Sequence, residues 1–255
     1  MAVNDVVALQ LKALRMPTAA GLVGQLLETA RLEDWTPEDL VRELLEQEIE
    51  GRRRRRIDRL LGGARLPPGK TLATLDASRL PQRTRRLLPS LCEGDFADRA
   101  ENVLVFGLPG RGKTHLAAAI GYELVQRGRS VLFVPAFKLV GRLLRAKRDL
   151  ELEAELRRLD RFEVLILDDI GYVQQDREEM EVLFTLLSER YERRSVVITS
   201  NLVFSEWDRI FRDPMTTAAA IDRVVHHSII IEFGKEMPSV RAEEAKTRNR
   251  PGDTL

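Results

Sequence analysis

Residues 102–114 read NVLVFGLPGRGKT, a short apolar run followed at once by a glycine-rich loop. The last eight of these residues match the pattern G-x-x-x-x-G-K-[ST], and a helix is expected over residues 114–126. Glycines in such a loop let backbone N–H groups point at phosphate oxygens, and the positive end of the following helix dipole adds to the attraction. The order of strand, loop and helix therefore predicts a phosphate-binding site for ATP.

The side chains of this loop have separate expected tasks. Lys113 is expected to span the β- and γ-phosphates, and the Thr114 hydroxyl is expected to ligate Mg²⁺. The other residues predicted to contact the nucleotide are Gly107, Pro109, Gly110, Arg111, Gly112 and His115. A glycine-rich turn can match the pattern by chance, but the position between a strand and a helix argues against that interpretation.

A second apolar run, residues 164–167, is followed directly by Asp168 and Asp169. Asp168 is expected to hold Mg²⁺, and Asp169 is expected to polarise the water that attacks the γ-phosphate. Acids also cap many strand ends, so this pair gains its meaning from the glycine-rich loop. Together the two segments predict an ATPase with Mg²⁺ as its cofactor.

The fold class follows from five short apolar runs separated by amphipathic stretches, at residues 103–106, 131–134, 164–167, 196–199 and 229–233. Continuous runs rich in β-branched residues are typical of a parallel sheet with both faces covered. We therefore expect an α/β, doubly wound domain with a five-stranded parallel sheet.

The domain organisation is predicted from changes in pattern along the 255 residues. Residues 1–66 are expected to form a small all-α domain, to which the family resemblance given below assigns assembly and DNA contact, with one helix starting at Thr36-Pro37-Glu38-Asp39. Residues 67–101 are expected to be a linker with a short helix around Arg83 to Cys92, and residues 102–234 the ATPase domain. Residues 235–255 are a polar tail that is expected to fray.

Composition bounds the class of protein. With 44% hydrophobic residues the chain can bury a core, and its single cysteine excludes a disulfide framework. The N-terminus lacks the apolar segment of a signal peptide, and no run has the length of a membrane span. We expect a cytoplasmic protein with no membrane partner.

One topological detail narrows the class of ATPase. Along the sequence, a full strand at residues 131–134 comes after the loop strand and before the Asp168 strand. This order resembles that of the AAA+ and RecA-like group. In that group a polar residue after the next strand contacts the γ-phosphate or the attacking water, and the residue at this position here is Asn201. The alternative is that Ser200-Asn201 is simply a turn. An arginine finger from a neighbouring subunit points to Arg223, although an ordinary surface ion pair fits it too.

The whole pattern resembles a known family, the IstB-type transposition helper ATPases of bacterial insertion sequences, which are related to the helicase loader DnaC. The segments that carry the resemblance are GLPGRGKTHLAAAIG, VLILDDIGYVQQDREEMEVLFTLLSERYE, VVITSNLVFSEW, AAAIDRVVHH and LKALRMPTAAGLVGQLLETA. The resemblance implies an AAA+ core without a C-terminal lid, assembly into homo-oligomers with ATP at subunit interfaces, ATP-dependent remodelling of target DNA, and delivery of that DNA to a cognate transposase.

Two positions depart from the expected pattern. Most AAA+ proteins carry glutamate where this chain has Asp169, whose shorter side chain bears on the rate of hydrolysis. The family's closing Gly-x-Ser-Tyr-Arg is present only as a looser Gly234, Ser239, Val240 and Arg241. The resemblance implies Arg241 as a second nucleotide sensor.

Contacts with double-stranded DNA are predicted from two basic sets. The first is Arg52, Arg53, Arg54, Arg55 and Arg56; the second is Lys138, Arg142 and Arg145, which recur at helical spacing. Guanidinium groups suit phosphates, and no base-reading module is visible, so binding should be largely independent of sequence. The alternatives are a solvated basic face or, for the first set, pairing with acids of a neighbouring helix.

Three functions are therefore weighed. The first is an ATP-dependent DNA-remodelling regulator of transposition, and the second is a replicative helicase loader of DnaC type with the same core. The N-terminal helical module resembles the first more than the second. The third is an assembly protein in which ATP is a structural clip between subunits and turnover is incidental.

Overall fold

The structure is a computed structural model that describes residues 3–172, 177–202, 225 and 227–234. The chain divides into two compact units, Met1–Arg59 and Leu60–Leu255. Each unit is described by itself below. No helix within the described ranges is both long and apolar enough to cross a bilayer.

The first unit consists of three helices, α1 (Val3–Ala13), α2 (Pro17–Leu32) and α3 (Pro37–Ala64), the last of which continues beyond the unit. The predicted start of α3 is confirmed. The Asp39 N–H donates to Thr36 Oγ1 at 3.2 Å, and the Thr36 N–H donates to Asp39 Oδ2 at 3.2 Å. This reciprocal arrangement is a capping box with aspartate as its acid.

A buried glutamate ties α2 to α3. Glu48 of α3 is 3% exposed, and its Oε2 accepts the N–H groups of Thr18 at 2.8 Å and Ala19 at 3.1 Å. Those two amides lie in the first turn of α2, which has no side-chain cap of its own. Gly51 permits the approach, because a Cβ there would overlap the Thr18 side chain.

The second unit contains the predicted five-stranded parallel sheet, in the order β2-β3-β4-β1-β5. The prediction of an α/β fold with five parallel strands is confirmed. Its strands are β1 (Asn102–Phe106), β2 (Val131–Pro135), β3 (Val164–Asp168), β4 (Ser195–Ser200) and β5 (Ser228–Glu232).

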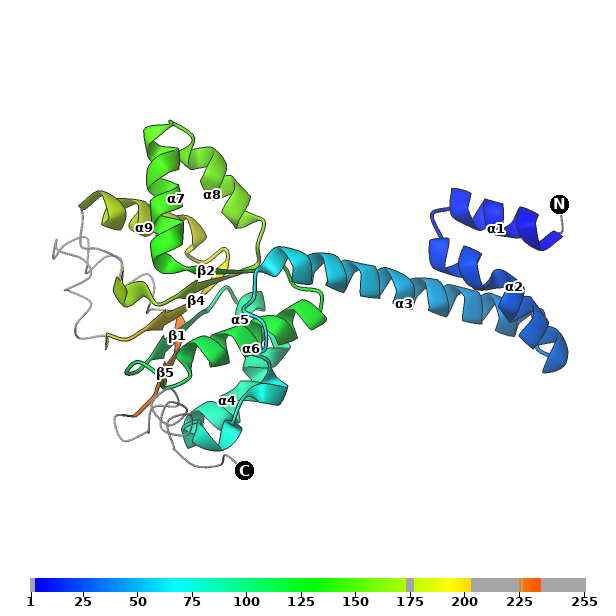
Figure 1. The fold of residues 1–255 in the computed structure, drawn as a ribbon, viewed down its shortest axis with the longest axis horizontal. Coiled ribbons are helices and arrows are strands. Elements are labelled where there is room, and N and C mark those ends of the chain that lie inside the picture. Colours follow the sequence, from blue (N-terminus) through cyan, green and yellow to red (C-terminus); the bar gives the residue numbers. More distant parts are fainter. Residues whose placement is uncertain (1–2, 173–176, 203–224, 226, 235–255) are drawn as a thin grey trace, which may run out of the picture. The chain divides into compact units, whose positions relative to one another are not determined.

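Helices cover both faces of this sheet. The helix predicted before the sheet is confirmed as α4 (Gln82–Glu93), and it lies with α6 (Lys113–Gln126) on one face, as Figure 1 shows. The opposite face carries α7 (Ala136–Arg148), α8 (Leu152–Asp160) and α9 (Arg177–Arg190). Shorter segments are α5 (Asp95–Asp98), η1 (Leu72–Thr74), η2 (Ala77–Arg79) and η3 (Ile170–Tyr172).

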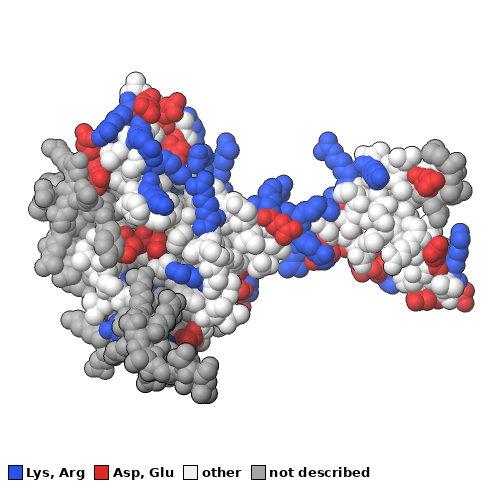
Figure 2. Space-filling view, viewed as in Figure 1, with Lys and Arg blue, Asp and Glu red and all other residues white. Residues whose placement is uncertain are grey.

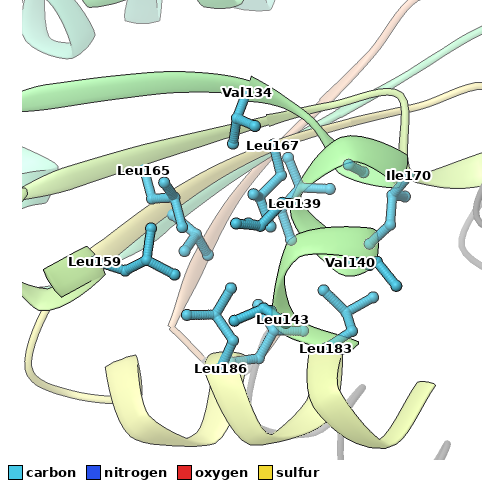
Figure 3. Packing of buried hydrophobic residues seen from close by; sticks show 14 of the residues in the cluster. Val134, Leu139, Val140, Leu143, Leu159, Leu165, Leu167, Ile170, Leu183 and Leu186 are labelled. Carbon is cyan, nitrogen blue, oxygen red and sulfur yellow. The ribbon is translucent and has the colours of Figure 1, made fainter. Parts of the chain in front are cut away.

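The core under α7, α8 and α9 fixes the position of β3. Leu165 and Leu167 of β3 are fully buried and belong to one cluster with leucines of all three helices, as Figure 3 shows. Burial of one such leucine stabilises the fold by roughly 1.5–3 kcal/mol. Neighbouring residues of a strand point to opposite faces, so a shift of β3 by one residue would move these leucines out of the cluster. Their burial therefore fixes the register of the strand that ends in Asp168.

Replacement of Glu48 by glutamine is expected to destabilise the contact of α2 with α3 by roughly 1–3 kcal/mol. Burial raises the pKa of Glu48, but the hydrogen bonds from Ala19, Arg52 and Thr18 and the charge of Arg55 outweigh it and lower the pKa below its ordinary value of 4.5. The stabilisation is therefore complete above that value and is lost as the pH falls through the lowered pKa.

Amide hydrogen exchange at Thr18 and Ala19 measures this effect. Glu48→Gln should speed exchange at pH 7, and the difference from the unmodified chain should shrink once the pH falls below 4.5, the ordinary value. Glu46→Gln, at an exposed position of the same helix, is the matched control. Equal exchange in both variants would contradict the assigned role of Glu48.

Candidate nucleotide-binding site

The glycine-rich loop leaves the carboxyl end of β1 and enters α6. Gly107, Gly110 and Gly112 have φ values of 154°, 79° and 93°, which residues with a Cβ rarely adopt. A Cβ on Gly107 would lie 2.7 Å from Cβ of Phe233, so the backbone passes too close to the end of β5 for any other residue. The loop conformation therefore depends on these glycines.

The Lys113 side chain lies over this loop. It is 7% exposed, and its Nζ donates to the carbonyl oxygens of Gly107 at 2.7 Å and Leu108 at 3.1 Å. An ammonium group has three donors and no acceptor, and two of the donors face these carbonyls. The loop thus holds the positive charge of Lys113 at the amino end of α6. Both this charge and the positive end of the helix dipole attract an anion.

Asp168 lies at the carboxyl end of β3, beside the start of α6. Thr114 Oγ1 donates to Asp168 Oδ2 at 3.2 Å, and Thr199 Oγ1 of β4 donates to Asp168 Oδ1 at 2.8 Å. Each carboxylate oxygen therefore has a hydroxyl partner from a different element. The contact joins two predicted metal ligands, Thr114 and Asp168, that are 54 residues apart in the chain.

Asp169 follows in a left-handed backbone conformation, with φ of 62°. Its N–H donates to Thr199 Oγ1 at 2.8 Å. Aspartate tolerates this conformation better than most residues with a Cβ, because its short polar side chain can bond locally. The backbone conformation at this position is therefore compatible with aspartate.

These residues fit a magnesium nucleotide. Hydroxyl and carboxylate oxygens are the ligands that Mg²⁺ prefers, and Thr114 and Asp168 supply one of each within 3.2 Å. The glycine loop and the buried ammonium of Lys113 lie at the same carboxyl edge of the sheet. When bound, Mg²⁺ would supply charge neutralisation of the phosphates, with Thr114 and Asp168 as its protein ligands.

Asn201 lies after β4, next to the segment that follows Asp169. A Cβ on Gly171 of η3 would overlap Asn201 Oδ1, so the amide packs directly against the backbone there. Asn201 Oδ1 is buried, and it has no hydrogen-bond partner among the residues that the structure describes. The Asn201 side chain is thus held against η3, which begins directly after Asp169, and its role as a sensor of the γ-phosphate stays a prediction.

The remaining predicted nucleotide contacts differ in their surroundings. Pro109 is exposed in the loop, and Arg111 is partly buried there. His115 Nε2 lies 3.1 Å from the carbonyl oxygen of Thr71 and 3.2 Å from Thr74 Oγ1, so the ring joins α6 to η1. Arg223 and Arg241 lie outside the described residues.

The first basic set is divided by its contacts. Arg52 Nε and Arg55 Nη2 each lie 3.0 Å from Glu48 Oε1, and Arg55 Nη1 donates to Thr18 Oγ1 at 2.6 Å. These two arginines therefore belong to the α2–α3 contact, and their acid partner lies on their own helix rather than on a neighbouring one. Arg53, Arg54 and Arg56 are exposed on α3.

The second basic set does not form the single open face that its spacing predicts. Arg142 Nε lies 2.6 Å from Glu155 Oε1 of α8, and its side chain is 23% exposed. Burial lowers the pKa of Arg142, and the charge of Glu155 opposes that shift. Lys138 and Arg145 are exposed, and Figure 2 shows Lys and Arg side chains gathered over α7 and α8.

Two residues of this site were not predicted, Thr199 and Gly171. Thr199 was assigned only to the apolar run 196–199, but it lies within hydrogen-bond distance of both Asp168 and Asp169. A hydroxyl residue next to the end of a central strand was the available signal, because carboxyl ends of parallel strands meet at one edge of the sheet.

Comparison with known proteins gives matches over most of the chain. Residues 9–247 match a family model described as IstB-like ATP binding protein. An insertion sequence ATP-binding protein of Sinorhizobium fredii is 45% identical over 246 residues, which cover 95% of this chain and 83% of the relative. An ATP-binding protein of insertion sequence IS21 from Pseudomonas aeruginosa is 39% identical, covering 92% of this chain and 88% of the relative.

Two solved structures are similar in fold to most of the chain. The crystal structure of DnaI is 23% identical with a TM-score of 0.55, over 66% of this chain and 95% of that chain. AMPPCP-bound DnaA from Aquifex aeolicus is 19% identical with a TM-score of 0.53, over 72% of this chain and 57% of that chain. At these identities the likeness shows the fold alone.

Proposed function

The chain belongs to the family of IstB-like ATP-binding proteins of insertion sequences, and from this premise we propose that it is an ATP-dependent regulator of transposition. In this proposal it hydrolyses ATP with Mg²⁺, oligomerises on target DNA, remodels that DNA and delivers it to a cognate transposase. The observation that carries the proposal is the Thr114–Asp168 contact of 3.2 Å beside the glycine-rich loop, in a chain whose relatives bear insertion-sequence names.

Hydrolysis is assigned to the residues at the carboxyl edge of the sheet. Lys113 holds the β- and γ-phosphates by charge-assisted hydrogen bonds, and Thr114 with Asp168 binds the metal. Asp169 orients the attacking water and accepts its proton. Asn201, held against Gly171, reports the state of the γ-phosphate to the segment after β3.

Completion of the site by a second copy is part of the proposal. Arg223 is assigned as the finger that stabilises the charge of the transferring phosphoryl group in the neighbouring subunit. Arg241 is assigned as a second nucleotide sensor within its own subunit. Both assignments come from the family resemblance, and that of Arg223 implies a homo-oligomer with ATP at its subunit interfaces.

DNA contact is assigned to the N-terminal helical domain, residues 1–66, and to α7. The proposed contacts on α3 include the exposed residues Arg53, Arg54 and Arg56, and those on α7 include the exposed residues Lys138 and Arg145. Guanidinium groups bind phosphate oxygens, and no base-reading module is visible in the sequence, so the proposed binding to double-stranded DNA is largely independent of sequence.

A helicase loader of DnaC type would use the same ATPase fold. The likeness to DnaI, at 23% identity, supports that fold and no particular partner. The identities of 45% and 39% are to proteins named for insertion sequences. These higher identities favour transposition over helicase loading.

The proposed function is tested by ATP turnover measured with Mg²⁺ alone, with duplex DNA, and with duplex DNA plus the cognate transposase. Turnover should rise when transposase joins the DNA-bound oligomers, which electron microscopy of the same samples should reveal. Asp169→Asn, which keeps the volume and the short polar side chain, should bind ATP and turn it over at least 100-fold more slowly, since general base catalysis contributes roughly 10²–10⁴-fold.

Indifference of turnover and assembly to DNA and transposase, together with a response to the replicative helicase, would contradict the proposal. A chain that binds ATP and assembles on DNA without turnover would instead favour ATP as a structural clip between subunits.

The proposed DNA face is tested by the double change Arg53→Gln and Arg54→Gln. Loss of two phosphate contacts should reduce the slope of log binding constant against log salt by up to about 1.8, since each contact contributes about 0.9. Arg85→Gln with Arg86→Gln, two exposed positions on α4, is the control pair.

Arg52→Gln with Arg55→Gln should instead lower thermal stability, because these side chains contact buried Glu48. An unchanged salt slope in the Arg53 and Arg54 variant would remove α3 from the DNA face.

A further inference from the structure

Thr199 of β4 is a buried residue whose hydroxyl contacts both carboxylate residues of the site. Its side chain is 0% exposed. Thr199 Oγ1 donates to Asp168 Oδ1 at 2.8 Å and accepts the Asp169 N–H at 2.8 Å. One hydroxyl therefore connects the proposed metal ligand to the residue that is proposed to orient water.

The bond to Asp168 fixes the orientation of that carboxylate. With Oδ1 occupied by Thr199, Oδ2 faces Thr114 Oγ1 at 3.2 Å. A carboxylate held by two hydroxyls from two elements cannot rotate about its terminal bond without losing a charge-assisted hydrogen bond. Asp168 Oδ2, the oxygen that faces the other proposed metal ligand, Thr114, is thus held in place before any metal binds.

The bond to Asp169 holds a backbone conformation that most residues with a side chain avoid. At φ of 62° the residue lies in the left-handed region, at a cost of roughly 1–2 kcal/mol. The hydrogen bond from its N–H to Thr199 offsets part of that cost. Release of this bond would let Asp169 and η3, which begins at Ile170, relax away from the edge of the sheet.

We propose that Thr199 is a positioning residue that sets the Mg²⁺ affinity of Asp168 and the orientation of Asp169 through these two hydrogen bonds. The proposal rests on the proposed function of the site. A hydroxyl is suited to the task because it donates and accepts at one atom, whereas the isosteric side chain of valine does neither.

Ser195 gives an internal comparison on the same strand. Its side chain is also 0% exposed, and its Oγ donates to the carbonyl oxygen of Phe96 at 3.3 Å. That bond lies at the amino end of β4, away from the carboxylates, and serves packing alone. Removal of the Ser195 hydroxyl therefore reports the general cost of a lost buried hydrogen bond in β4.

The test compares Thr199→Val, Thr199→Ser and Ser195→Ala in the full chain. The probe is a fluorescent, non-hydrolysable ATP analogue, and its dissociation constant is measured in EDTA and in saturating Mg²⁺. Thr199→Val should keep the affinity in EDTA and lose about tenfold or more of the gain from Mg²⁺, as expected for one hydrogen bond to a charged group. Thr199→Ser and Ser195→Ala should stay within about twofold of the unmodified chain.

Turnover provides a second readout. Thr199→Val should lower kcat at saturating Mg²⁺ and nucleotide, whereas a purely structural change would alter the melting temperature alone. Thr199→Val with an unchanged gain from Mg²⁺, or Thr199→Ser as defective as Thr199→Val, would overturn the proposal.

A double-mutant cycle covers the case in which Thr199→Val also lowers stability. In the Asp168→Asn background, Thr199→Val should cause no further loss of Mg²⁺-dependent affinity, since the two side chains act as a unit. Additive losses would overturn the proposal. An unmodified chain without turnover would contradict the proposed hydrolysis, whereas the binding measurements would still decide the role of Thr199.

Discussion

The hydrogen bond between Thr114 and Asp168 depends on the alignment of the carboxyl ends of three neighbouring parallel strands. β4 lies between β1, which ends in the glycine-rich loop, and β3, which ends in Asp168. Any slip of β3 by one residue would turn Asp168 toward the opposite face and bury a different set of side chains. The leucines of β3 that pack under α7, α8 and α9 prevent that slip, so the apolar core and the polar site stabilise one register.

A buried polar group stabilises each of the two units internally. Glu48 accepts two amides at the start of α2, and Arg190 of α9 donates to the carbonyl oxygens of Leu159, Phe162, Glu163 and Ser195. Burial lowers the pKa of Arg190 to about 10, so the guanidinium stays charged at neutral pH. Each group satisfies backbone atoms that would otherwise be buried without partners, which costs roughly 1–3 kcal/mol per group.

Sequence reasoning predicted the elements whose signal is local. The five apolar runs became the five strands, and the loop of residues 107–112 precedes α6. Contacts that depend on the packing of other elements were not predicted. The hydroxyl of Thr199 next to the end of its strand was a signal, but the strand order that places β4 beside β3 is not local in the sequence. Arg142 has the spacing of an open basic face, but the packing of α8 brings Glu155 against it. In the sequence Arg52 and Arg55 do not differ from the other arginines of the run. The structure distinguishes them, because both contact the buried carboxylate of Glu48.

The central claim is that the glycine-rich loop, Thr114 and Asp168 form one magnesium-nucleotide site. Calorimetric titration of ATP in Mg²⁺ and in EDTA tests it most directly, with the unmodified chain, Lys113→Ala and Asp168→Asn compared. Lys113→Ala should weaken ATP binding under both conditions by about tenfold or more, since a charged hydrogen bond contributes roughly 1.5–3 kcal/mol. Asp168→Asn should weaken binding only in Mg²⁺. An affinity for ATP that is unchanged by Lys113→Ala would contradict the account, as would an equal loss with and without Mg²⁺ in Asp168→Asn.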